Sequence, residues 1–102
     1  MNKRLLFLEQ MVQSGKADSF ARYALGMEYR KEGRVDDAVR TFTDLREVDP
    51  AYVAQYLMAG QMLVEAGRRD EGKIWLETGV AQARKSGDAH ALGELESALA
   101  GL

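Results

Sequence analysis

Few side chains in this 102-residue chain have a type and spacing that could support catalysis. The one histidine, His90, has Asp88 two residues before it, which is too small a ligand set for a metal ion. The pairs Asp36-Asp37 and Asp70-Glu71 could serve in acid–base chemistry. Both pairs begin predicted helices, where capping and the helix dipole account for carboxylates. We therefore predict a non-catalytic protein with no metal and no cofactor.

The chain contains no cysteine, which excludes disulfides, thiolate metal ligands and a cysteine nucleophile, and this suits a reducing compartment. It carries 14 lysines and arginines against 16 aspartates and glutamates, so no positive field favours nucleic acid. Acidic residues interleave with the basic residues near the predicted turns, and we interpret these basic residues as a solvated rim. They are Arg30, Lys31, Arg34, Arg68 and Arg69.

The first residues resemble the opening of a signal peptide. Their apolar run ends at Glu9-Gln10, however, and is too short for that role. No segment approaches the roughly 18 apolar residues of a membrane span. We predict a cytoplasmic protein whose partners include neither nucleic acid nor membrane.

The pattern of residues 25–42 returns 34 residues later, at residues 59–76. The matched pairs include Gly26 with Gly60, Gly33 with Gly67, Arg34 with Arg68, Asp36 with Asp70 and Phe42 with Leu76. A fixed period of this length is typical of proteins built from stacked repeats.

Apolar periodicity and end signals predict six helices, at residues 2–14, 19–32, 36–48, 52–66, 70–85 and 88–100. Asp36 and Asp88 are expected to cap the third and sixth helices, and Asp18 or Ser19 the second. Gly15 suits a left-handed cap at the end of the first helix.

Glycine inside a helix costs about 1 kcal/mol relative to alanine. Its recurrence at Gly26 and Gly60 therefore predicts close helix approach at both places. Trp75 is expected in the core between the fifth and sixth helices. In the last helix Leu92, Leu95 and Leu99 should share one face, while Glu94, Glu96 and Ser97 should face outward.

The repeated unit resembles the tetratricopeptide repeat, a helix–turn–helix with a large–small pair, aromatic and small residues, and a proline at set places. The matching residues of the first repeat are Leu25-Gly26, Tyr29, Ala38, Phe42 and Pro50. Those of the second are Ala59-Gly60, Leu63, Gly72 and Leu76, and Arg84 replaces the proline. The resemblance covers residues 19–86 well.

This resemblance implies an all-α, right-handed superhelix of about two repeats, with an extra N-terminal helix and a C-terminal capping helix. We expect a single domain over residues 1–102, with an N-terminal helix at about 2–15. Its repeats would span residues 19–52 and 53–86, and its capping helix residues 88–100.

In the family, the first helices of successive repeats line a concave groove. Carried over by register, the residues of the first repeat are Phe20, Tyr23, Met27, Arg30 and Lys31. Those of the second are Ala54, Leu57, Gln61, Val64 and Glu65. Some members hold carboxylate-ended peptides with lysine and asparagine; Tyr23 and Met27 stand at those places, so we predict no such clamp here.

The resemblance implies a protein-interaction module that presents this largely apolar groove to a peptide or helix of a partner protein. An alternative is a self-associating structural protein, a homodimer that buries the same strip. A third possibility is that the strip packs against helices of its own chain. The sequence identifies neither partner nor pathway.

Overall fold

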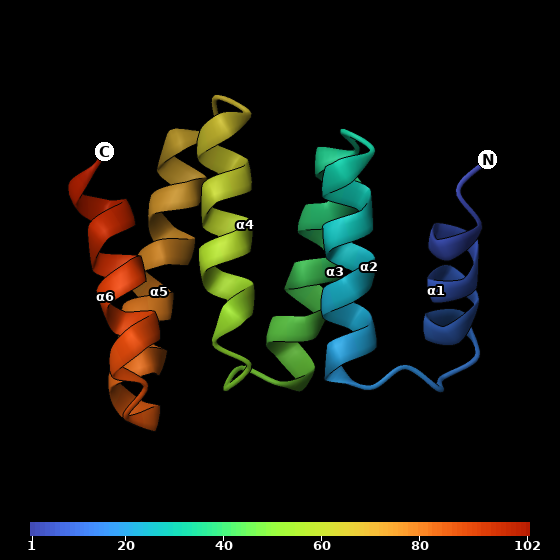
Figure 1. Cartoon of the computed structure of the whole chain (residues 1–102), viewed down its shortest axis with the longest axis horizontal. Coiled ribbons are helices and arrows are strands. Elements are labelled where there is room, and N and C mark those ends of the chain that lie inside the picture. The colour runs from blue at the N-terminus through green and yellow to red at the C-terminus, as the bar shows by residue number, and fades with distance from the viewer. The chain divides into compact units, whose positions relative to one another are not determined.

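The computed structural model describes residues 1–102 as six helices joined by short turns (Figure 1). They are α1 (Lys3–Gln13), α2 (Ser19–Lys31), α3 (Val35–Val48), α4 (Ala54–Glu65), α5 (Arg69–Ser86) and α6 (Ala89–Ala100). The predicted all-α repeat architecture is confirmed, and each predicted helix boundary lies within two residues of the observed one. None of the six combines the length and apolar character that crossing a bilayer would require.

The helices gather into two compact units, Met1–Asp49 and Pro50–Leu102, and each is described by itself. In the first unit α2 packs on both α1 and α3. In the second unit α5 packs on α4 and α6, and α4 also contacts α6. The expectation of one domain over the whole chain stays a prediction.

The helix starts follow two different rules. Asp18 and Asp88 cap α2 and α6 as predicted, because each side chain accepts a hydrogen bond from a backbone N–H three residues later. The predicted cap at Asp36 is wrong: α3 begins at Val35, and no side chain caps it. The first-turn carboxylate of Asp37 is instead paired with Arg34, at 2.9 Å.

Within each repeat the two helices are joined by a tight turn that contains glycine. Gly33 and Gly67 have φ values of 74° and 81°, in the left-handed region where a side chain would be strained. The next residue then donates its N–H back into the preceding helix, from Arg34 to Tyr29 at 2.9 Å and from Arg68 to Leu63 at 2.8 Å.

The predicted close approach at Gly26 and Gly60 is confirmed. A Cβ on Gly26 would lie 2.7 Å from the ring of Phe42, which is fully buried. A Cβ on Gly60 would lie 2.6 Å from Leu76. Gly72 also has no room for a side chain, because its Cβ would lie 2.8 Å from the carbonyl oxygen of Gly60, which is a backbone atom. In each repeat, therefore, a large side chain of the second helix packs against a glycine of the first helix: Phe42 against Gly26, and Leu76 against Gly60.

The core of the second unit is built around Tyr56, which is completely buried on α4. Its hydroxyl donates a hydrogen bond to the carbonyl oxygen of Pro50 at 2.6 Å, and its ring lies 6.0 Å from that of Trp75. Trp75 is 5% exposed, so its predicted burial is confirmed; the aromatic ring it contacts is on α4. Leu95 brings α6 into this core, because it would meet any Cβ added to Gly79.

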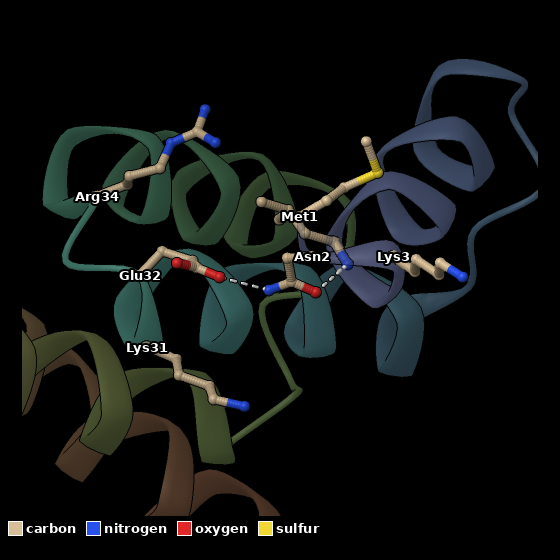
Figure 2. A pocket seen from close by; sticks show the side chains of 7 residues that line it. Met1, Asn2, Lys3, Lys31, Glu32 and Arg34 are labelled. Atoms are coloured by element: carbon tan, nitrogen blue, oxygen red, sulfur yellow. Dashed lines mark hydrogen bonds between the residues drawn. The ribbon is translucent and has the colours of Figure 1, made fainter.

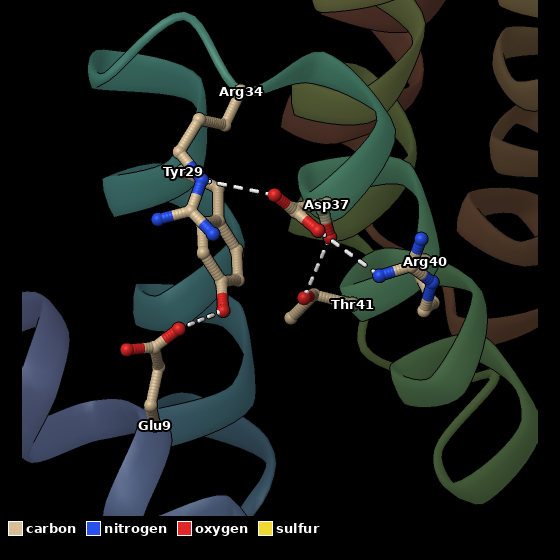
Figure 3. Close-up of polar contacts among 6 residues, drawn as sticks. All are labelled: Glu9, Tyr29, Arg34, Asp37, Arg40 and Thr41. Atoms are coloured by element: carbon tan, nitrogen blue, oxygen red, sulfur yellow. Dashed lines mark hydrogen bonds and ion pairs between the residues drawn. The ribbon is translucent and has the colours of Figure 1, made fainter.

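The first unit carries a chain of polar contacts centred on Tyr29 (Figure 3). The Tyr29 hydroxyl donates a hydrogen bond to the carboxylate of Glu9 and so ties α2 to α1. The guanidinium of Arg34 lies 4.7 Å from the centre of the tyrosine ring and also pairs with Asp37. Asp37 in turn pairs with Arg40 at 3.0 Å. This chain of contacts connects all three helices of the first unit.

Substitution of Gly72 by alanine is expected to lower the free energy of unfolding by roughly 1–3 kcal/mol, because the new Cβ strikes backbone that cannot rotate away. Gly93→Ala on α6 is the matched control. No atom lies within 4 Å of its new Cβ, so better helix propensity should raise stability by up to about 1 kcal/mol. Urea denaturation of the two variants measures both effects. Equal stability of Gly72→Ala and the parent would refute the tight contact of α4 with α5.

Alkaline pH is expected to destabilise the protein partly through Tyr29. Burial, together with the hydrogen bond to Glu9, raises the pKa of Tyr29 from 10.0 to about 12. The folded state therefore holds this proton more tightly, and its contribution is complete below pH 10 and lost as the pH rises towards 12. Melting temperatures between these two pH values should fall more steeply for the parent than for Tyr29→Phe, which has no proton to lose there. If the melting temperatures of the parent and of Tyr29→Phe fall equally with pH, the raised pKa of Tyr29 is contradicted.

Candidate functional site

The predicted groove residues of the first unit lie on α2 and form one strip. Phe20 is 63% exposed, whereas Tyr23, Met27 and Arg30 are half-buried and Lys31 is exposed. Their spacing of three to four residues places them along one face of the helix. The strip therefore begins with a large exposed aromatic ring and ends in basic side chains.

Tyr23 belongs partly to the core. Its ring meets that of Phe42 edge-on, with the centres 6.2 Å apart. Burial raises the pKa of the Tyr23 hydroxyl, and the positive charge of Arg30 acts in the opposite direction. Tyr23 is therefore packed against Phe42, the core residue whose ring also lies against Gly26.

Lys31 borders a hollow of about 720 Å³ where α1 begins and α2 ends (Figure 2). Asn2 holds this place together: its side chain accepts from the N–H of Leu5 at 3.0 Å and donates to Glu32 at 2.6 Å and to Glu28 at 3.0 Å. The polar groups of Asn2 and Glu32 are thus engaged with one another. We interpret this hollow as the joint that attaches α1 to α2.

The predicted residues of α4 line a groove shared with α6. Three adjoining hollows, of about 690, 390 and 280 Å³, make up this α4–α6 groove. From α4 the lining includes the half-buried Leu57, Gln61 and Val64 together with the exposed Glu65. Gln61 is common to the first two hollows and Leu57 to the first and third, so the three form one continuous surface.

The same register relates α2, α4 and α6. Counted from the glycine of each helix, the strip residues stand three before it and one, four and five after it. From Gly26 these are Tyr23, Met27, Arg30 and Lys31; from Gly60 they are Leu57, Gln61, Val64 and Glu65. From Gly93 they are His90, Glu94, Ser97 and Ala98, and all four line the largest of the three hollows.

The α6 residues of the groove are absent from the sequence-based prediction. Glu94 and Ser97 are exposed, as predicted, but they also line the groove against α4, which was not predicted. The large–small pair Leu92-Gly93, which follows Ala59-Gly60 by 33 residues, is the signal that identifies them. His90, predicted at the surface, has an 89% exposed side chain.

The structure thus brings the α4 residues together with α6, and it places the α2 residues on a strip of the first unit. The two sets lie in different compact units. Tyr23 and Met27 offer neither an ammonium group nor an amide at the places where a carboxylate clamp would need them.

Comparison with known proteins agrees with this architecture. A tetratricopeptide repeat family model matches residues 29–100. A crystal structure of a tetratricopeptide repeat domain protein from Salinibacter ruber is 34% identical, with a TM-score of 0.73 over 81% of this chain and 92% of that one. A solution structure of a protein from Bordetella parapertussis is 27% identical, with a TM-score of 0.81 over 97% of this chain and 86% of that one. No curated protein matches. The chain belongs to the tetratricopeptide repeat family.

Proposed function

We propose that this chain is a protein-interaction module that presents the α2 strip and the α4–α6 groove to a peptide or helix of a partner protein. Proteins of this family generally act as non-catalytic scaffolds that bind other proteins. The observation that carries the proposal is the continuous α4–α6 groove, whose walls repeat one register on two helices. Action in the cytoplasm stays a prediction.

The affinity would come from apolar burial and the orientation from charge. Leu57 and Val64 are half-buried, so a partner side chain that covers them removes further apolar surface from water. Arg30 and Lys31 would fix the direction of a segment bound on the α2 strip, and Glu65 that of a segment bound in the α4–α6 groove. The helices that carry these residues are held by glycine contacts, so little ordering would be needed on binding.

A second candidate function is self-association through the same strip. The exposed ring of Phe20 favours it, because a large aromatic side chain 63% open to water gains by being covered. A homodimer would cover this ring with a second copy of the chain. Light scattering at tens of micromolar separates the two functions, since a monomer at that concentration excludes the dimer.

The proposed function predicts that charge on the strip abolishes partner capture. Tyr23→Lys combined with Leu57→Lys places ammonium groups on the α2 strip and in the α4–α6 groove. The matched control is Val48→Lys with Ile74→Lys, two exposed apolar residues that line none of the hollows and are 63% and 59% exposed. Each protein, with its helix content checked by circular dichroism, serves as bait in a lysate of the source organism.

We expect the wild type and the control to retain a protein that the strip variant loses. If both variants retain the same proteins, the strip is not the binding surface. If the wild type retains only further copies of itself, self-association becomes the leading function.

A further inference from the structure

We propose that the α4–α6 groove selects a cationic segment, in which an apolar residue is flanked by lysine or arginine. This inference rests on the proposed function and adds the chemical class of the partner. It is carried by the charges that line the groove and by the shape of its floor.

Carboxylates dominate the ionisable side chains along the groove, where His90 is the one other titratable residue. Asp88, Glu65 and Glu94 contribute carboxylates to its lining, and no lysine or arginine lines any of the three hollows. The whole chain is almost balanced, with 14 basic and 16 acidic residues, so this distribution is a local property. Arg69 lies at one end of the groove, where it donates a hydrogen bond to a main-chain oxygen of Leu102, a lining residue.

The acidic groups are exposed, and they come from both walls of the groove. Glu94 lies at its centre, with a side chain that is 50% exposed and 3.2 Å from the imidazole of His90. Asp88 stands at the start of α6 and Glu65 at the end of α4, in two different hollows. A bound segment that follows the groove would therefore pass carboxylates along its whole length. A negatively charged segment would meet like charges at each of them.

The floor between these carboxylates suits the aliphatic stem of a lysine or arginine. Leu57 and Val64 project from α4, and the opposite wall is made of small groups, at Gly93, Ser97 and Ala98. A long basic side chain can lay its methylene groups on such a surface and carry its charge to the rim. Small residues on α6 leave the necessary space, because no atom lies within 4 Å of a Cβ built on Gly93.

Two fluorescein-labelled peptides of about a dozen residues test this class of partner. One alternates leucine with lysine, and the other has glutamate at every lysine. Fluorescence anisotropy with the full chain is expected to show binding of the lysine peptide alone. An increase from about 50 to about 300 mM salt should weaken that binding, because screening acts on exposed charges.

A pair of charge reversals locates the site. Glu94→Lys is expected to weaken binding of the lysine peptide by at least about tenfold, because it replaces attraction by repulsion at the centre of the groove. Glu77→Lys makes the same change in net charge at an exposed residue of α5 that lines none of the hollows, and should leave the affinity within about twofold. Circular dichroism verifies that both variants are folded.

Equal loss of affinity in both variants would overturn the assignment of the site, since it would indicate attraction to the net charge alone. Binding of the glutamate peptide, or of neither peptide, would overturn the cationic class. Neither result removes the proposed function, because capture of a partner through Tyr23 and Leu57 is measured independently. If the wild type and the strip variant capture the same proteins while the lysine peptide still binds, the groove is a site for cationic peptides and the proposed function is overturned.

Discussion

The contact on which the rest of this structure depends is the approach of two helices at a place where both lack a side chain. Gly72 of α5 lies so close to the backbone of Gly60 on α4 that a single added carbon would meet its carbonyl oxygen at 2.8 Å. Such a contact fixes both the separation and the rotation of each helix about its axis. Once the rotation is fixed, every other face of the helix is fixed as well. The strip residues of α4 face the groove because the glycine side of α4 faces α5.

Each pair of repeat helices has one neighbouring helix in its unit: α1 packs on the α2–α3 pair, and α6 packs on the α4–α5 pair. Different contacts hold these two neighbours. The contact residue stands two positions after the glycine of its helix. Glu28 follows Gly26 on α2 and contacts α1, whereas Leu95 follows Gly93 on α6 and contacts α5. Leu95 is 1% exposed and fills the space over Gly79, so apolar packing holds α6. Glu28 is 9% exposed and is held by Asn2 and by Arg4, at 3.0 Å from each. The hydrogen bond from Asn2 is the main reason that the pKa of Glu28 is lowered. A carboxylate at this depth must keep its partners, so directional polar contacts attach α1 in addition to its buried leucines, Leu5 and Leu8.

Most of the fold could be predicted from the sequence because its signals are local. Helical periodicity, glycine at turns and glycine at helix contacts recur at one offset, and all of them reappear in the structure. The start of α3 was misplaced by one residue because a carboxylate such as that of Asp36 can stand either at the cap or in the first turn of a helix, and the sequence does not distinguish these places. The helix α5 extends further than its counterpart α3, with 18 residues against 14. Pro50 lies two residues after the end of α3, whereas Arg84 stands at the equivalent place in the second repeat and lets α5 continue to Ser86.

The groove was only half predicted, because its second wall depends on how α6 is rotated. Gly93 on α6 follows Gly60 on α4 by 33 residues, one fewer than the repeat period of 34. Carrying the groove residues of α4 forward by 34 positions therefore selects the wrong face of α6. The rotation is set by Leu95, which must enter the core, and this leaves Glu94 and Ser97 on the groove side. One face of α6 therefore packs in the core through Leu95, and another lines the groove through Glu94 and Ser97. Substitutions on the groove face remove little buried surface, whereas those at Leu95 would open a cavity. The charge of the groove can therefore change through α6 while the packing that holds α6 in place is kept.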